Sequence, residues 1–242
     1  WDGNYQLSDF DWTDPNTGAA VDPSVITSEN MNQFKYALKE NVVSFEGKTI
    51  APGDRKYRDL TGEGVVNSND RTAIGDTNPL FNFGINNEFR IGNLDVGVFI
   101  DGSYGGKILN AFRRQLEPSL DNNINNLSTE AWAGRWTPEN GSNVYARLLN
   151  QTDQQVSTYY VEDGSYLRIK NLNIGYTFGQ KYFGRSGISK LRVYLLIDNV
   201  YTFTKYSGLD PEVRSYEKFL RALDQTSYPR TRNYMAGVNI TF

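Results

Sequence analysis

The stretch FNFGINNEFRIGNLDVGVFIDGSY, residues 81–104, decides the fold. Every second residue of segment 81–91 is apolar, with Asn87 as the exception, and the residues between them are polar or glycine. Segment 94–104 repeats the apolar spacing up to Gly102. Strict alternation is typical of β-strands, whose successive side chains point to opposite faces of a sheet. The stretch therefore predicts two strands, each with one apolar face.

The two segments are joined by Gly92-Asn93, a pair that favours a two-residue β-hairpin turn. In such a hairpin the flanking residues pair directly and share one face of the sheet. The flanking residues are Ile91 and Leu94, which both lie on the apolar faces. The turn and the two alternations therefore agree, and they predict an antiparallel hairpin.

Three further segments alternate in the same way, namely residues 171–179, 189–205 and 233–242. The last of them ends on Phe242, as the final strand of a bacterial outer-membrane barrel usually does, where this pattern serves as the assembly signal. The signal residues predicted here are Tyr234, Val238, Ile240 and Phe242. We thus predict an all-β chain of antiparallel transmembrane β-barrel strands.

Two cations disturb the alternation just before residue 171. Arg168 and Lys170 fall on the same parity as the apolar residues that follow them. Near a strand end, such long side chains can extend along apolar surface and place their charge among polar headgroups. The pattern therefore predicts that both cations reach out from the apolar face.

Composition narrows the function. The chain has 242 residues, a net charge of −3, 38% hydrophobic and 14% aromatic residues, and neither Cys nor His. These absences exclude a disulfide framework, a Cys- or His-ligated metal site and an imidazole base. The acidic balance gives no attraction for nucleic-acid phosphates. A transmembrane β-barrel remains compatible with this low hydrophobicity, because only every second residue of its strands faces lipid.

The connections between the predicted strands alternate in length, as they do in outer-membrane barrels. Residues 92–93 and 180–188 are short and would be periplasmic, whereas residues 105–163 and 206–228 are long and would be extracellular. The predicted organisation is an extracellular loop region over 1–79, with a candidate first strand, followed by C-terminal barrel strands over 80–242.

Helical spacing within the long connections predicts three short helices. They cover residues 28–39, residues 107–117, and a segment that Ser128 caps and that runs to Trp136.

One loop has the skeleton of a twelve-residue calcium site. In DLTGEGVVNSND, residues 59–70, oxygen-bearing residues fall at the ligand positions, and Gly64 occupies the place of the sharp turn. The predicted ligands are Asp59, Thr61, Glu63, Val65 through its carbonyl, Asn67 and Asp70. The alternative is a glycine-rich turn that Asx-type hydrogen bonds stiffen. Ca²⁺ is the only cofactor that the sequence suggests.

Several stretches, in fixed order over residues 53–242, resemble SusC/RagA-type TonB-dependent outer-membrane transporters. They are GDRKYRDLTGEG (53–64), RWTPEN (135–140), VEDGSYLRIKN (161–171), DNVYTFTKYSGLDPE (198–212), YPR (228–230) and the terminal Phe242. Thr61 and Glu63 depart from the family pattern, which tends to Asn and Asp there.

The resemblance implies a C-terminal segment of a barrel with about 22 strands, in the outer membrane of a Gram-negative bacterium. It also implies an N-terminal plug and further strands, coupling to TonB, contact with outer-membrane lipid, and a SusD-like surface lipoprotein as partner. The expected activity is import of oligosaccharides or peptides. No nucleic acid is expected as a partner.

Two other functions compete with this interpretation. A soluble carbohydrate-binding β-domain explains the aromatic residues and the calcium-like loop, but not the alternating connection lengths. An enzyme is not expected, because the sequence fixes no pair of catalytic groups at one site. Candidate contacts to substrate or lipoprotein, chosen because aromatic rings stack on sugars, are Trp132, Trp136, Tyr206 and Asp210.

Overall fold

A computed structural model describes residues 1–117, 126–148, 155–184, 186–213, 222–225 and 228–242. The chain divides into two compact units. Unit 1 comprises residues 1–74 and 111–160, and unit 2 comprises residues 75–110 and 161–242. In the part of the chain that is described, no helix has both the length and the apolar character needed to cross a membrane.

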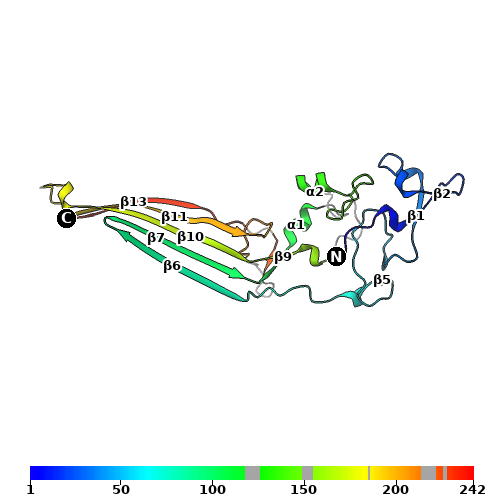
Figure 1. Cartoon of the computed structure of the whole chain (residues 1–242), viewed down its shortest axis with the longest axis horizontal. Helices are drawn as coiled ribbons and strands as arrows, with labels where there is room; N and C mark the ends of the chain where they lie inside the picture. The colour runs from blue at the N-terminus through cyan, green and yellow to red at the C-terminus, as the bar shows by residue number, and fades with distance from the viewer. Residues whose placement is uncertain (118–125, 149–154, 185, 214–221, 226–227) are drawn as a thin grey trace. The chain divides into compact units, whose positions relative to one another are not determined.

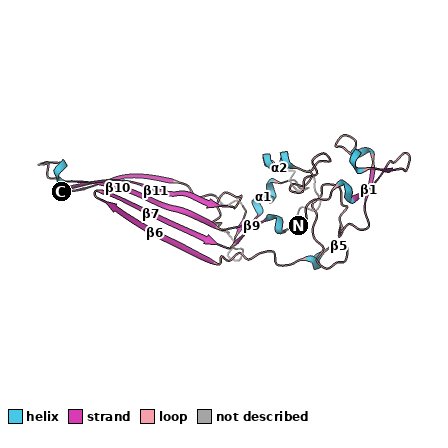
Figure 2. Ribbon diagram, in the orientation of Figure 1, coloured by secondary structure: helices cyan, strands magenta, loops and turns pink. Residues whose placement is uncertain are grey.

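Unit 2 is built on one five-stranded antiparallel sheet (Figure 2). Its strand order is β13-β11-β10-β7-β6, so neighbours in sequence are neighbours in the sheet apart from inserted short elements. The strands are β6 (Phe81–Ile91), β7 (Leu94–Tyr104), β10 (Tyr166–Gly179), β11 (Lys190–Thr204) and β13 (Asn233–Thr241). All five segments that alternate in the sequence are strands, as predicted.

The first pair of strands forms the predicted hairpin. Ile91 lies opposite Leu94, and the register continues without a break to Phe81 opposite Tyr104. Gly92 adopts a φ of 60°, the left-handed conformation that glycine tolerates best and that this turn requires. The hairpin prediction is therefore confirmed in turn position, register and face.

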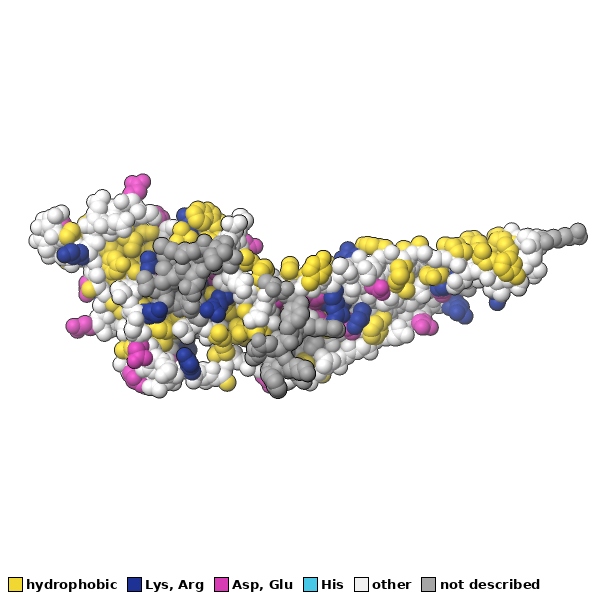
Figure 3. Space-filling view, turned by 180° about the vertical axis from the view of Figure 1, so that it is seen from behind, with side chains coloured by type: hydrophobic (Ala, Val, Ile, Leu, Met, Phe, Trp, Pro, Cys, Tyr) yellow, Lys and Arg dark blue, Asp and Glu magenta, His cyan; other side chains and the backbone are white. Residues whose placement is uncertain are grey.

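The apolar stripes of the strands merge into one continuous face. A row across the sheet joins Phe89, Val96, Ile174, Leu195 and Ala236 through direct strand pairing. The side chains of this face remain exposed, with Phe89 at 56%, Leu195 at 40% and Ile174 at 38%. Figure 3 shows hydrophobic side chains gathered along the sheet. We call this surface the apolar face.

A bulge changes which residues belong to the apolar face. Between Ile169 and Asn171 the register of β10 shifts against both of its neighbours. On β11 the shift is accommodated at Asn199, whose φ of 53° is left-handed, a conformation that Asn tolerates better than most residues. A single extra residue exchanges the two faces of a strand. Leu167 therefore joins the apolar face beyond the bulge.

The predicted placement of the two cations is therefore wrong. Arg168 is only 1% exposed and bonds to Thr202 on the polar face, where Nε lies 2.8 Å from the hydroxyl oxygen. Lys170 forms an ion pair with Asp101, with 2.8 Å between Nζ and Oδ2. A count of alternating residues places both cations on the apolar face, but the extra residue at the bulge moves them to the polar face.

On the polar face, one ion pair spans three strands. Arg192 on β11 donates to Asp95 on β7 through Nε at 3.1 Å and Nη2 at 2.5 Å. The strand between them carries Gly175, where a Cβ atom would come within 2.4 Å of the Arg192 guanidinium and 2.6 Å of the Asp95 carboxylate. The missing side chain of this glycine thus leaves room for the ion pair.

We predict that Gly175→Ala weakens this pair and lowers the free energy of unfolding by about 1 kcal/mol, since the clashing atoms are the ends of side chains that can move. The matched control is Gly97→Ala, whose added Cβ would meet nothing nearer than 3.8 Å. Urea unfolding of the lipid-reconstituted protein measures both variants. Equal stability of the two variants would contradict the prediction.

Short elements complete unit 2. A three-stranded sheet of order β12-β8-β9 contains β8 (Lys107–Asn110), β9 (Val161–Asp163) and β12 (Leu223–Asp224). A 3₁₀ helix, Gln180–Tyr182, follows β10. We call the end of the five-stranded sheet at which β7 ends and β10 begins the loop end. The opposite end of the same strands is the turn end.

Unit 1 consists of short strands and short helices joined by irregular segments, and Figure 1 labels several of these elements. Its strands are β1 (Phe10–Thr13), β2 (Ala20–Val21), β3 (Lys35–Leu38), β4 (Ser44–Phe45) and β5 (Val65–Val66), and its α-helices are α1 (Ala111–Leu116) and α2 (Thr129–Gly134). Its 3₁₀ helices are Leu7–Asp9, Pro23–Val25, Met31–Gln33, Ser68–Asp70 and Thr158–Tyr160. A buried cluster of Tyr5, Phe10, Trp12, Ile26 and Ile50 forms its core.

The two units do not follow the predicted linear boundary. Their first border, at residues 74 and 75, lies close to the predicted one at 79 and 80. Residues 111–160, however, lie within the predicted loop 105–163 and pack with residues 1–74 in unit 1. Parts of the predicted loops 105–163 and 206–228 fall outside the described residues.

Of the three predicted helices, one is confirmed, one is confirmed in part and one is wrong. Ser128 caps α2 as expected, with its hydroxyl oxygen accepting from the Ala131 amide at 3.1 Å. In segment 107–117 only the second half is helical, because the first half forms β8. The prediction for 28–39 is wrong, since the segment holds one 3₁₀ turn and then β3, which pairs with β1.

Candidate functional site: the loop cluster

Arg168 lies at the centre of a cluster of charged groups at the loop end of the sheet. Its Nη2 lies 2.5 Å from an Asp210 carboxylate oxygen, and its Nη1 lies 3.1 Å from Glu212. The side chain of Arg168 is only 2% exposed. A buried guanidinium is tolerated where carboxylates pair with it and where its remaining N–H groups find acceptors. Arg168 therefore fixes segment 210–212 onto the sheet.

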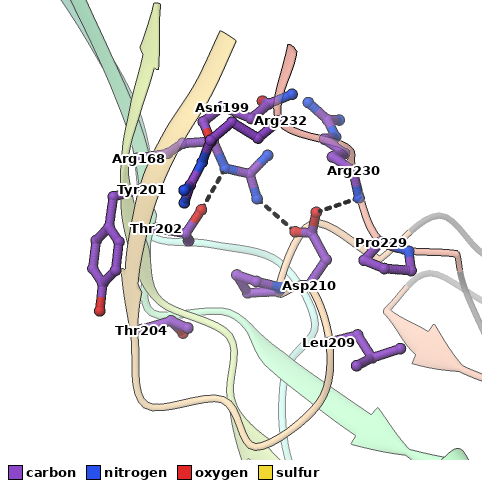
Figure 4. Close-up of a pocket in the computed structure, with 11 residues that line it drawn as sticks. Arg168, Asn199, Tyr201, Thr202, Thr204, Leu209, Asp210, Pro229, Arg230 and Arg232 are labelled. Carbon is purple, nitrogen blue, oxygen red and sulfur yellow. Dashed lines mark hydrogen bonds and ion pairs between the residues drawn. The ribbon is translucent and has the colours of Figure 1, made fainter. Parts of the chain in front are cut away.

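A second arginine, Arg230, closes the cluster from the segment that precedes β13. Arg230 pairs with Glu212, and its backbone N–H lies 3.4 Å from Asp210 Oδ2. Asp210 also accepts from the Glu212 amide at 2.9 Å, as in an Asx turn. Figure 4 shows Asp210 facing Arg168 and Arg230, with Tyr201 on the other side of the β11 ribbon.

Residues 206 and 207, which come earlier in the same connection, are held by hydrogen bonds from hydroxyl and amide groups. Tyr206 is 5% exposed, and its hydroxyl donates to Asp224 at 2.6 Å. Burial and the nearby Asp224 carboxylate raise the pKa of Tyr206. The amide of Ser207 donates to Glu162 at 2.8 Å, and Asn110 donates to the same carboxylate at 3.1 Å. We call this whole set the loop cluster: Asn110, Glu162, Arg168, Tyr206, Ser207, Asp210, Glu212, Asp224 and Arg230.

The loop cluster unites stretches that lie far apart in the sequence. Seven of its nine members, all except Asn110 and Asp224, come from the segments VEDGSYLRIKN, DNVYTFTKYSGLDPE and YPR, which carry the family resemblance. The structure thus assigns these stretches a shared task, which is to fold the connection after β11 back over the sheet.

Unit 1 brings together the two remaining motifs. Trp136 of RWTPEN is 4% exposed and packs against Gly53, where an added Cβ would lie 2.4 Å from the indole ring. The neighbouring Asp54 is buried and accepts from Arg147 Nε at 2.6 Å. The Arg147 amide in turn donates to the Gly53 carbonyl at 2.9 Å. Gly53 is therefore required by a close approach between distant segments.

A buried ionic network lies beside this contact. Glu117 accepts from Arg55 at 3.2 Å, from Arg113 at 2.6 Å and from the Tyr159 hydroxyl at 3.0 Å. Arg55 is fully buried, and its guanidinium stacks 3.7 Å from the Tyr159 ring centroid. Burial raises the pKa of Glu117, while the two arginines favour its charged form. The network ties residues 55, 113–117 and 159 into one core.

The four predicted contact residues differ in their exposure. Trp132 is 51% exposed, and the Arg135 guanidinium lies 4.0 Å from its ring centroid. Trp136 and Tyr206 are buried, and Asp210 is engaged by Arg168. Only Trp132 of the four therefore presents an open aromatic surface, and contact with substrate or lipoprotein stays a prediction for it.

The assembly-signal residues lie together on the apolar face. Their exposed fractions are 64% for Tyr234, 57% for Val238, 50% for Ile240 and 84% for Phe242. Their role in assembly stays a prediction.

The calcium-like loop is held by its own backbone. Asp59 accepts from the amides of Gly62 at 2.7 Å and Gly64 at 2.6 Å. Asp70 accepts from the amides of Leu60 at 2.7 Å and Asn67 at 2.8 Å. Among the described residues no three Asp or Glu side chains are grouped for a metal ion. This geometry is that of the Asx-type alternative, and Ca²⁺ binding stays a prediction.

These hydrogen bonds make the loop sensitive to acid. The Gly64 amide is the main cause of the lowered pKa of Asp59, and the Asn67 amide is the main cause for Asp70. A lowered pKa stabilises the fold above the ordinary value of 3.8, and this contribution is lost as the pH falls through the lower folded value. We therefore expect pepsin to cut the loop faster at pH 2.5 than at pH 4.5, beyond the change at other sites.

Asp59→Asn combined with Asp70→Asn serves as the control, and we expect its loop cutting to change between the two pH values no more than cutting at other sites does. An unchanged pH response in that variant would contradict the assignment. Cutting at pH 7 by a neutral protease, with either Ca²⁺ or a chelator present, tests the ion itself. Slower cutting with Ca²⁺ would support it.

Several known proteins are similar to this chain in sequence. No protein-family model matches. TonB-dependent receptor P3 of Formosa agariphila is 35% identical over 199 residues, which are 79% of this chain and 19% of that protein. TonB-dependent receptor SusC of Bacteroides thetaiotaomicron is 24% identical over 212 residues, which are 86% of this chain and 19% of that protein.

The fold leads to the same group. The structure of the RagAB peptide importer in the open-open state matches 69% of this chain and 17% of the matched chain, with a TM-score of 0.56 and 26% identity. The structure of the RagAB peptide transporter matches 62% of this chain with a TM-score of 0.53 and 28% identity.

The antiparallel sheet with its exposed apolar face and its loop cluster thus defines a segment of the transporter-barrel class. The chain belongs to the SusC/RagA-type TonB-dependent receptors. It spans about one fifth of the length of the curated relatives it matches. These relatives are named receptors and importers, which agrees with the expectation that the chain is not an enzyme.

Proposed function

We propose that the chain contributes barrel strands and surface loops to a receptor that imports nutrients across the outer membrane of a Gram-negative bacterium. The observation that carries this proposal is the continuous apolar face of five strands. A sheet face of exposed Phe, Ile, Leu and Val side chains is disfavoured in water and favoured in lipid. The polar face of the same sheet carries the ion pairs, as expected for a barrel interior.

Aromatic residues on the apolar face occur in two belts. At the loop end they are Phe81, Tyr104, Tyr201 and Phe203. At the turn end they are Phe89, Tyr176, Phe178, Tyr182 and Phe242. Within the belts, the ring centroids of Tyr201 and Phe203 lie 4.6 Å apart, and those of Tyr176 and Phe178 lie 4.8 Å apart. Such belts are typical of the two membrane–water interfaces.

The separation of the belts fits a bilayer. Phe178 of the turn-end belt pairs with Leu191 on β11. Tyr201 of the loop-end belt lies further along β11, beyond the bulge. About nine strand rises of 3.3 Å separate the two levels. At a strand tilt of about 40° this corresponds to roughly 23 Å, close to the apolar band of about 25 Å in outer-membrane barrels. The loop end then faces outward if the short connections are periplasmic.

The partners of the proposed receptor follow from its relatives. We infer a SusD-like surface lipoprotein at the extracellular side, the remaining strands and plug of the same receptor, and coupling to TonB through that part. The cargo is a peptide or an oligosaccharide, and the similarity to a structure named a peptide importer supports the first. Copurification of a lipoprotein with the tagged receptor tests the partner.

The face assignment can be tested at two consecutive positions. Leu195 lies on the apolar face and Leu196 on the polar face, although both are leucines. We expect a spin label at Leu195→Cys, in a cysteine-free receptor in lipid, to be accessible to oxygen and shielded from a water-soluble nickel complex. A label at Leu196→Cys serves as the control and should show the reverse preference. Nickel access at both positions would overturn the proposal in favour of a soluble β-domain.

A further inference from the structure

A cavity of about 240 Å³ lies at the loop end between β11, segment 209–211 and segment 229–232. Three arginines line it, Arg168, Arg230 and Arg232, together with Asn199 and Asp210, as Figure 4 shows. A cavity of this size has room for several water molecules or for a small solute with part of its hydration shell.

The charges around this cavity do not balance. Arg168 and Arg230 share the two carboxylates of the loop cluster, Asp210 and Glu212. Arg232 adds a third positive charge, so among the described residues that line the cavity or pair with its lining, one positive charge is left over. The nearest further carboxylate in sequence, Asp198, is not among the residues that line the cavity; it accepts from the Asn171 side chain at 2.8 Å on the neighbouring strand.

Arg232 is the group whose charge is unmatched. Its Nε donates to the Asn199 carbonyl at 3.4 Å, and no carboxylate pairs with it among the described residues. The Asn199 side chain is used elsewhere, because its amide donates to the Thr231 carbonyl at 2.8 Å. Arg232 is exposed, so its terminal N–H groups remain open to a ligand from solution or from the membrane interface.

We propose that this cavity binds an oxyanion, a phosphate or carboxylate group, with Arg232 as its principal contact. A guanidinium presents two parallel N–H groups that match two oxygens of such an anion. Arg168 and Arg230 are held in place by Asp210 and Glu212, whose charges they balance, and they form the wall behind Arg232. Leu209, Pro211 and Pro229 form the apolar part of the lining, against which the neutral part of a larger anion packs.

The backbone also prepares the site. The β11 bulge places the Asn199 carbonyl beside the Arg232 Nε, where the hydrogen bond holds the side chain on the cavity wall. A side chain that is already positioned loses less conformational entropy when it binds. This irregularity of β11 lies beside the extra residue of β10 that turns Arg168 to the polar face, so the same part of the sheet positions both arginines.

Titration of the intact receptor with inorganic phosphate tests the proposal, in nanodiscs of neutral phosphatidylcholine at constant ionic strength. We expect saturable heat of binding for the native receptor and at least tenfold weaker binding for Arg232→Gln. Arg232→Lys should fall between them, because lysine keeps the charge and loses the planar fork. The matched control is Arg90→Gln, an exposed arginine on β6 at the turn end, which should bind as the native receptor does.

A second series distinguishes the source of the anion, with phosphatidylglycerol added to the nanodiscs. Suppressed phosphate binding would identify a lipid headgroup as the occupant, and unchanged binding would identify a soluble ligand; both results support the site. Three outcomes would overturn it: no saturation by the native receptor, equal binding by Arg232→Gln, or equal loss in Arg90→Gln. None of these depends on transport, so failure here leaves the proposed import function intact.

Discussion

A receptor carrying Arg168→Met is expected to lose about 3 kcal/mol of stability and the ordered packing of the connection after β11. The substitution removes the buried cation and leaves Asp210 without its 2.5 Å partner. Removal of one member of a buried ion pair typically costs about 3–5 kcal/mol, since the other charge stays desolvated. The lower end applies here, because Glu212 keeps Arg230 and is 28% exposed.

Two measurements check this result. Urea unfolding of the reconstituted receptor gives the stability, and trypsin cleavage at Lys205 reports whether the loop stays folded over the sheet. We expect faster cleavage in Arg168→Met and partial recovery when Asp210→Asn is added, because the second change removes the unpaired charge. Arg90→Met is the control, with native stability. If Arg168→Met behaved like Arg90→Met, the loop cluster would have no stabilising role.

The same arginine marks the limit of what alternation can predict. The strands, the hairpin turn at Gly92 and the apolar parity up to Leu172 follow from a period of two, because nothing interrupts the pleat there. One extra residue in β10, between Ile169 and Asn171, reverses the parity of the residues that precede it. No residue count can detect such an insertion. The sequence does contain one sign of the bulge. The apolar residues lie at even positions from Leu172 onward but at odd positions at Leu167 and Ile169, and a continuous strand can change parity in this way only if it contains an extra residue.

The organisation of unit 1 was out of reach for a different reason. The unit joins residues 1–74 to residues 111–160, which are separated by the whole of β6 and β7. The sequence shows the motifs at Gly53 and Trp136 but not that they touch. Helical spacing in segment 28–39 was overruled by the pairing of β3 with β1. Local pattern therefore predicts the membrane strands well, and long-range packing decides the loop residues.

The contact between these motifs leads to the second large effect. Gly53→Ala should destabilise unit 1 by about 3 kcal/mol. Gly53 has a φ of 84°, where an L-residue costs about 1–2 kcal/mol, and its new Cβ would lie 2.4 Å from the Trp136 ring. Overpacking of that kind adds about 1–3 kcal/mol, because the buried indole has no free space to move into.

Gly62→Ala isolates the backbone part of this effect. Its φ of 80° is nearly the same, but an added Cβ would meet nothing within 4 Å. We expect a loss of only about 1 kcal/mol there. The difference between the two alanine variants, measured by thermal unfolding of unit 1 within the receptor, therefore reports the packing of Gly53 against Trp136. Combining Gly53→Ala with Trp136→Leu should reduce that difference, since the smaller side chain vacates the space. If the two glycine variants were equally destabilised, backbone strain alone would explain the glycine, and the motifs would not be coupled by this contact.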